Sequence, residues 1–91
     1  MANLDSVPCR SGGVMGSVVD GEAVLVLPEK GKVKVLNEVG AFIWSKVDGE
    51  GSVRQISELL AAEYEVGKSE AEEDSLAFLS DLEERGVVFF K

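Results

Sequence analysis

The sequence predicts an α+β fold in which a three-stranded antiparallel sheet is followed by three helices. Up to position 36 the chain contains short runs rich in β-branched residues, separated by turn residues, which is the pattern of strands. Beyond position 37 the apolar residues recur every three or four positions, as on the inner face of a helix. With 91 residues, the chain has the size of one small domain. Strands first and helices afterwards is an order typical of α+β domains.

Two strands are predicted to form a hairpin, and a third strand is predicted to follow it. The apolar runs 14–19 and 23–27 flank Asp20-Gly21, and Asp-Gly between β-branched runs is a strong hairpin signal. Residues 32–35 then alternate lysine and valine, and Leu36 follows them, so the valines lie on one face of the strand and the lysines on the other. We expect this third strand to be half buried.

Three helices are predicted from capping residues and apolar spacing. Asn37 is a good N-cap, while Ser52 with Gln55 and Ser69 with Glu72 have the spacing of capping boxes. The expected inner faces are Leu36, Gly40, Ile43 and Val47 in the first helix, Val53, Ile56, Leu59, Leu60 and Tyr64 in the second, and Ala71, Phe78, Leu79 and Leu82 in the third.

Residues 1–12 are predicted to be a flexible N-terminal tail, because they mix small and polar residues and lead into a Gly-Gly pair. The folded domain is expected to cover residues 13–91. The sequence shows neither a signal peptide nor an apolar run long enough to span a bilayer. Its single cysteine has no partner for an internal disulfide, so we expect a reducing, cytoplasmic setting and no membrane partner.

The net charge of −8 comes entirely from the second half of the chain. Residues 1–47 hold five acids and five bases, whereas residues 48–91 hold twelve acids and four bases. This half repels phosphate, so DNA or RNA is not an expected partner. Most of these acids are expected to form solvated helix faces.

Few residues suit catalysis or metal binding. The absence of histidine and the single cysteine, Cys9, remove histidine-based acid–base catalysis and the usual zinc sites. We interpret Cys9 as an incidental thiol, and the acidic run 70–74 lacks the spacing of a calcium loop. The sequence therefore predicts no catalytic residue, no metal site and no cofactor, and a function based on binding.

The third predicted strand offers a surface for such binding. It has no proline that would block pairing, so its outer edge can accept a peptide as an additional strand. If the third helix lies opposite, the two elements form a groove with backbone groups on one wall and apolar side chains on the other. An ordinary solvated edge is the alternative. An exposed Trp44 or Phe42 would instead favour docking to another protein.

Four motifs with a characteristic spacing lie within residues 14–90. They are Leu36-Asn37-Glu38-x-Gly40-Ala41-x-Ile43-Trp44, Asp48-Gly49, Ser52-Val53-x-x-Ile56 and Phe78-Leu79-x-x-Leu82-x-x-x-Gly86-Val87. Together they resemble the PqqD-like family, whose domain is also called the RiPP precursor-peptide recognition element. The resemblance implies three strands and three helices of winged helix-turn-helix type, the same order as that predicted above.

The resemblance also implies a non-catalytic carrier. Family members hold the leader of a ribosomally synthesised precursor peptide as an added strand between the third strand and the third helix. They deliver it to a modifying enzyme, such as a radical-SAM protein, a cyclodehydratase or a leader peptidase. Carried over to this sequence, the peptide-binding residues are Lys32, Val33, Lys34, Val35 and Leu36 in the strand and Ser75, Leu76 and Leu79 in the helix.

Two other functions are considered. A docking subunit that stabilises a modifying enzyme would use its helices as the contact surface. A transcriptional regulator of winged-helix type would need basic and amide side chains on the outer face of the second helix. That face offers only Arg54 and Gln55, beside Glu58 and Glu63, so the regulator is the weaker alternative.

Overall fold

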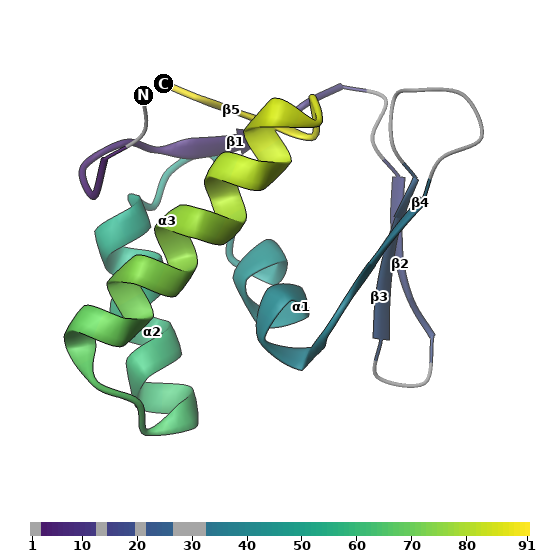
Figure 1. Ribbon diagram of the computed structural model, residues 1–91. Coiled ribbons are helices and arrows are strands. Elements are labelled where there is room, and N and C mark those ends of the chain that lie inside the picture. Colours follow the sequence, from purple (N-terminus) through teal and green to yellow (C-terminus); the bar gives the residue numbers. More distant parts are fainter. Residues whose placement is uncertain (1–2, 13–14, 20–21, 27–32) are drawn as a thin grey trace.

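The computed structural model describes residues 3–12, 15–19, 22–26 and 33–91. Within these ranges the chain forms five strands and three helices: β1 (Pro8–Arg10), β2 (Met15–Val19), β3 (Glu22–Val26), β4 (Val33–Leu36), α1 (Glu38–Ser45), α2 (Val53–Tyr64), α3 (Lys68–Glu84) and β5 (Val88–Phe90). The predicted α+β class with three helices is confirmed. The strands belong to two separate sheets, however, and one strand follows the helices (Figure 1).

The larger sheet is antiparallel, with the strand order β2-β3-β4. β2 and β3 pair along their whole length, and β4 pairs with β3 so that Lys34 lies opposite Leu25. The predicted hairpin is therefore present, although its turn at 20–21 and the segment 27–32 lie outside the described residues. β4 is the last strand of this sheet, and in the described part of the chain no strand pairs with its outer edge.

The smaller sheet joins the two ends of the chain. β1 runs antiparallel to β5, with Pro8 opposite Phe90 and Cys9 opposite Phe89. Pro8 and Cys9 are both buried. Residues 3–12 are thus part of the folded domain, and the prediction of a flexible tail is wrong for them. The sequence did not reveal β1 for two reasons. A strand of three residues is too short to show an alternating pattern, and its partner strand lies at the other end of the sequence.

The first two helices begin at the predicted caps. The Gly40 N–H donates to the Asn37 side chain at 2.8 Å, and Ser52 and Gln55 form a reciprocal capping box. Each cap provides acceptors for backbone N–H groups that have no partner within the helix. The caps therefore fix the start of α1, directly after β4, and the start of α2, after the loop that follows α1.

The third helix begins differently from the prediction. Its N-cap is Gly67, which makes no side-chain cap hydrogen bond, and the helix starts at Lys68. The predicted capping box of Ser69 and Glu72 is therefore wrong, because Ser69 already lies inside the helix. Gly67 has an ordinary extended cap conformation (φ −63°, ψ 150°), and the helix starts two residues earlier than a cap at Ser69 would allow.

The core lies where the inner faces of the three helices meet β3, β4 and the residues leading into β5. Most of the predicted inner residues are buried, but Leu59 is 49% exposed and Ser57 is buried in its place. The buried apolar cluster consists of Leu25, Leu36, Ile43, Trp44, Val47, Val53, Ile56, Leu60, Ala71, Leu79, Leu82, Val87 and Val88.

A glycine sets the approach of α3 to the start of α1. A methyl group on Gly40 would lie 3.0 Å from Cε1 of Phe78 and 3.3 Å from Oδ1 of Asn37. Glycine is unfavourable in a helix by roughly 0.5–1 kcal/mol relative to alanine. At position 40 the absence of a side chain leaves space for the Phe78 ring. Phe78, on α3, therefore packs directly on the first turn of α1, next to the end of β4.

We expect Gly40→Leu to lower the free energy of unfolding by about 1–3 kcal/mol, because the added side chain must displace Phe78 or Asn37. Urea unfolding followed by Trp44 fluorescence measures the change. Ala62→Leu, at an exposed position of α2, is the control and should change the free energy by less than about 0.5 kcal/mol. Equal stability of the Gly40 variant and the wild type would contradict this role of the glycine.

Candidate functional site

The outer edge of β4 is the surface that the sequence predicted to bind a peptide. Val33 and Val35 are each 59% exposed, whereas Leu36 is buried and Lys34 is partly buried. The valines and Lys34 lie on opposite faces, as the alternation predicted. The face turned toward the helices is that of Lys34 and Leu36, because β4 runs through Leu36 directly into α1. A hydrophobic pattern alone would place the valines inside.

The predicted site residues differ in their accessibility. Lys32 lies outside the described residues. On α3, Ser75 and Leu79 are fully buried, while Leu76 is partly exposed. The Ser75 hydroxyl is buried without a hydrogen-bond partner, an arrangement that costs stability. Of the three helix residues, only Leu76 is thus open to a ligand, and the other two belong to the packed side of the helix.

An ion-pair cluster connects β4 to α3. Lys34 Nζ lies 3.3 Å from Asp81 Oδ2, and Arg85 Nε donates to the same oxygen at 3.0 Å. The hydrogen bond from Arg85, and then that from Lys34, hold the pKa of the Asp81 carboxyl below its ordinary value of 3.8, although partial burial opposes them. The strand and the helix are therefore linked by charge beside the exposed edge.

The sequence did not indicate Asp81 and Arg85 as site residues. Their spacing of four positions is typical of an ion pair on one helix face, and such pairs are common on solvated helices. Only the contact with Lys34, on a distant part of the chain, distinguishes this pair. The one feature that could have predicted this contact is Lys34, the lysine of β4 that faces inward. The alternation of lysine and valine does not show which face of the strand is turned inward.

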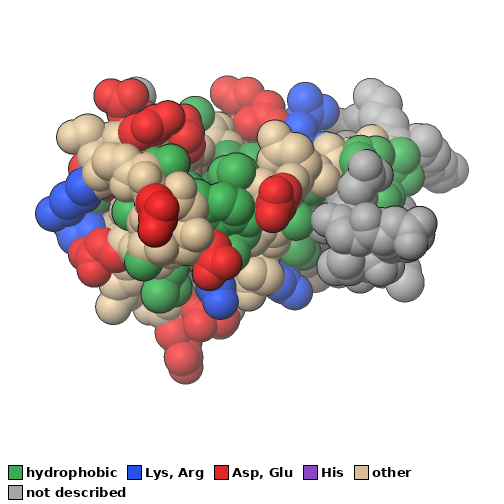
Figure 2. All heavy atoms as spheres, turned by 90° about the horizontal axis from the view of Figure 1, so that it is seen from below, with side chains coloured by type: hydrophobic (Ala, Val, Ile, Leu, Met, Phe, Trp, Pro, Cys, Tyr) green, Lys and Arg blue, Asp and Glu red, His purple; other side chains and the backbone are tan. Residues whose placement is uncertain are grey.

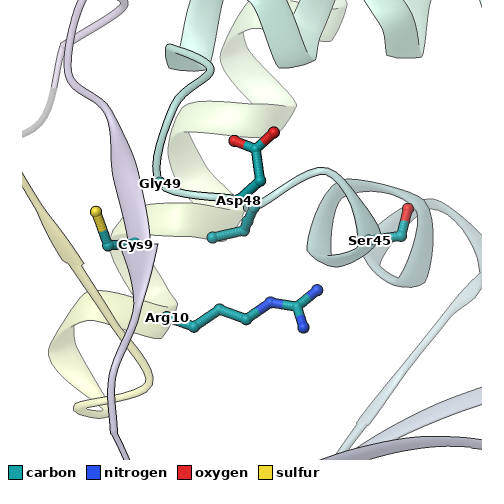
Figure 3. Close-up of a pocket in the computed structure, with 6 residues that line it drawn as sticks. Cys9, Arg10, Ser45, Asp48 and Gly49 are labelled. Carbon is teal, nitrogen blue, oxygen red and sulfur yellow. The ribbon is translucent and has the colours of Figure 1, made fainter.

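A pocket of about 500 Å³ lies elsewhere, between β1 and the loop after α1 (Figure 3). Arg10 Nη2 donates to the Trp44 carbonyl at 2.8 Å, and its guanidinium lies 4.4 Å above the Trp44 ring. The Cys9 sulfur and the Arg10 guanidinium point in different directions (Figure 3). These groups do not converge on one point, so the pocket is not a candidate reaction centre. Its lining residues are Cys9, Arg10, Ser45, Val47, Asp48 and Gly49.

The two aromatic residues of α1 are engaged within the chain. Trp44 is only 7% exposed, and Phe42 is partly buried. The Phe42 ring packs edge-on against Tyr64, with 5.6 Å between the ring centroids, and Lys46 Nζ lies 5.1 Å from the same ring. Neither is the freely exposed aromatic that would favour docking to another protein.

The outer surface of α2 does not suit nucleic acid. The guanidinium of Arg54 lies 3.3 Å from Asp5 and 3.9 Å from Glu72, so carboxylates already neutralise its charge. Gln55 is occupied by its capping box. Figure 2 shows acidic side chains spread over the face seen from below, around a strip of apolar side chains. This surface would repel phosphate.

Within the described ranges, no group of three His, Cys, Asp or Glu side chains is arranged to hold a metal ion. Of the helices in those ranges, none combines the length and the apolar character needed to cross a bilayer. The edge of β4 with the facing part of α3 therefore remains the candidate site.

Comparison with known proteins identifies the family. Residues 22–88 match the sequence model of the family described as coenzyme PQQ synthesis protein D (PqqD). The chain belongs to the PqqD family. The match runs from β3 into β5, so it includes both walls of the candidate site, and the resemblance seen in the sequence motifs is confirmed. Among curated proteins, none matches this PqqD-family chain significantly.

Three solved structures are similar to this PqqD-family domain. TbiB1 in complex with the TbiA(beta) leader peptide is 29% identical, with a TM-score of 0.79 over 88% of this chain and 93% of that one. A lasso peptide synthetase B1 complexed with the leader peptide is 25% identical, with a TM-score of 0.81 over 91% and 98%. The PqqD truncation of Methylobacterium extorquens PqqCD, a functional stand-alone RiPP recognition element, is 25% identical, with a TM-score of 0.82 over 98% and 95%.

We expect Asp81→Asn to lower the free energy of unfolding by about 0.2–1 kcal/mol at neutral pH, a small loss because the carboxylate is 40% exposed and partly screened. The pKa of Asp81 is lowered in the folded state. The stabilisation it provides is therefore fully present above the unfolded value, near 3.8, and is lost as the pH falls through the lowered folded value.

Urea unfolding at a series of pH values between 7 and 2.5 checks this expectation. The difference between wild type and Asp81→Asn should shrink below about pH 3.8. Asp74→Asn, an exposed carboxylate on the same helix, is the control for removing one negative charge. A difference that stays constant across the whole pH range would show that Asp81 does not act through its charge.

Proposed function

We propose that this PqqD-family domain binds the leader segment of a ribosomally synthesised precursor peptide and presents it to a modifying enzyme. Two similar proteins of known structure, TbiB1 and a lasso peptide synthetase B1, are complexes with leader peptides. A third, the PqqD truncation of PqqCD, is a RiPP recognition element that functions alone. The chain spans nearly the whole length of each of these, which supports a role for this domain by itself.

The observation that carries the proposal is the unpaired outer edge of β4. Backbone N–H and C=O groups at such an edge can form the hydrogen bonds of one more strand, and these bonds tolerate many side chains. Val33 and Val35, each 59% exposed, offer apolar contacts to that strand on one face. On α3, Leu76 is the predicted site residue that is partly exposed. Ser75 and Leu79 support α3 from within.

The proposed mechanism is presentation, without catalysis by the domain. A leader held on β4 keeps the attached core peptide near the enzyme, at an effective concentration on the order of millimolar for a short linker. This role needs no nucleophile, metal or cofactor. The buried Cys9 thiol and the structural contacts of Arg10 fit a domain that works by shape. We also propose that its helices and hairpin form a winged helix-turn-helix arrangement used for peptide rather than DNA.

An NMR titration with the leader peptide encoded beside this protein's gene tests the proposal. The backbone amides of residues 33–36 and of the facing part of α3 should shift most, because an added strand forms hydrogen bonds to β4. A scrambled peptide of the same composition is the control. Shifts centred on α2, with none on β4, would contradict strand addition.

N-methylation of the leader, one residue at a time, tests the hydrogen bonds directly. In an added strand only every second backbone N–H faces the partner strand. Affinity should therefore fall at alternate positions of the bound segment, by roughly fivefold or more for each lost hydrogen bond. This scan leaves the protein unchanged, so misfolding cannot produce the pattern. Losses without a period of two would argue for another binding mode.

A further inference from the structure

The charged cluster beside β4 has an unbalanced charge. Asp81 supplies one carboxylate, while Lys34 and Arg85 supply two cations that contact the same carboxylate oxygen. The side chains of Lys34, Asp81 and Arg85 are 25%, 40% and 47% exposed. The cluster is therefore accessible to a ligand. Because its side chains are partly buried, their charges interact more strongly than they would in bulk water. The cluster carries a net positive charge, although two of its three residues, Asp81 and Arg85, belong to the acidic half of the chain.

The position of the cluster relates it to the edge of β4. Lys34 and Leu36 are two residues apart, so their side chains leave the strand on the same face. A peptide strand added beside β4 places one side chain next to each of them on that face, about 5 Å away. Those two peptide residues are also two positions apart, whichever direction the peptide runs. Leu36 is only 2% exposed, so Lys34 is the residue of this face that an added strand can contact.

We propose that this site selects leader segments that place a carboxylate residue next to Lys34. The carboxylate pairs with Lys34 and Arg85. The proposal rests on the peptide-binding function proposed above and specifies the chemistry of the peptide. It assigns Lys34 and Arg85 a role in specificity that the strand edge alone does not provide.

A carboxylate fits better than a cation or a neutral group at this point. An added anion is attracted by two cations and repelled only by Asp81, whereas an added cation meets two like charges. Elsewhere the acidic side chains of α2 and α3 repel a negative peptide. The carboxylate is compensated where it lies next to Lys34 and Arg85, so the cluster favours a register of the leader more than it raises the affinity.

Selection from a phage-displayed library of random dodecapeptides tests the proposal. On the wild-type protein, the enriched peptides should share an Asp or Glu at one position of the selected motif. On Lys34→Glu, this preference should disappear or change to Lys and Arg. Lys68→Glu makes the same charge change on α3, roughly 20 Å away along the helix, and should select the same peptides as the wild type.

Each outcome separates this inference from the proposed function. Enriched peptides without an acidic preference, or with one that Lys34→Glu leaves intact, would overturn the inference and leave peptide binding in place. No enrichment over an uncoated surface would contradict peptide binding itself, and the inference with it.

A second measurement uses one selected dodecapeptide and its variants with Gln or Lys in place of the acidic residue. The Gln variant should bind the wild type about three- to tenfold more weakly. Lys34→Met keeps the apolar stem of the side chain but removes its charge, and should bind the acidic and Gln peptides with more nearly equal affinity. Circular dichroism and urea unfolding confirm that this variant is folded. An undiminished preference in Lys34→Met would overturn the role of Lys34.

Discussion

The position of β4 relative to α3 depends on the contact between Gly40 and Phe78. β4 ends at Leu36, Asn37 caps α1, and Gly40 lies in the first turn of α1. The strand and the start of α1 therefore form one continuous unit. Phe78 rests on that turn from α3. Leu36 anchors the same unit in the core. A small side chain in α1 and an aromatic one in α3 thus hold the two walls of the candidate site in place.

The exposed edge that suits peptide binding is also a liability. An edge strand with exposed valines invites pairing with a second copy of the same chain. Inward-pointing charged residues are one protection against this, and Lys34 is such a residue, held by Asp81. The net charge of −8 adds repulsion between copies. A peptide that carries a carboxylate avoids the first barrier. It brings an anion to Lys34, whereas the β4 strand of a second copy brings another lysine.

Features set by neighbouring residues were predictable from the sequence, while those set by distant residues were not. The caps at Asn37 and Ser52 depend on atoms three positions apart, and both were predicted. β1 was missed because its pairing with β5 is a long-range contact. The inward direction of Lys34 was missed for the same reason, because its partner Asp81 lies far along the chain, on α3. The capping box at Ser69 was wrong because glycine also serves as an N-cap, and the helix begins two residues earlier.

The pairing of β1 with β5 brings the two ends of the fold together, with Pro8 opposite Phe90 (Figure 1). Polypeptide attached before β1 and polypeptide attached after β5 leave the domain side by side, whereas β4 belongs to the other sheet. Adjacent ends are the geometry that tolerates circular permutation and insertion into a loop of a host protein. The same domain can therefore be carried as a separate chain, as a terminal fusion or as an insert, because the points of attachment lie on a different sheet from β4.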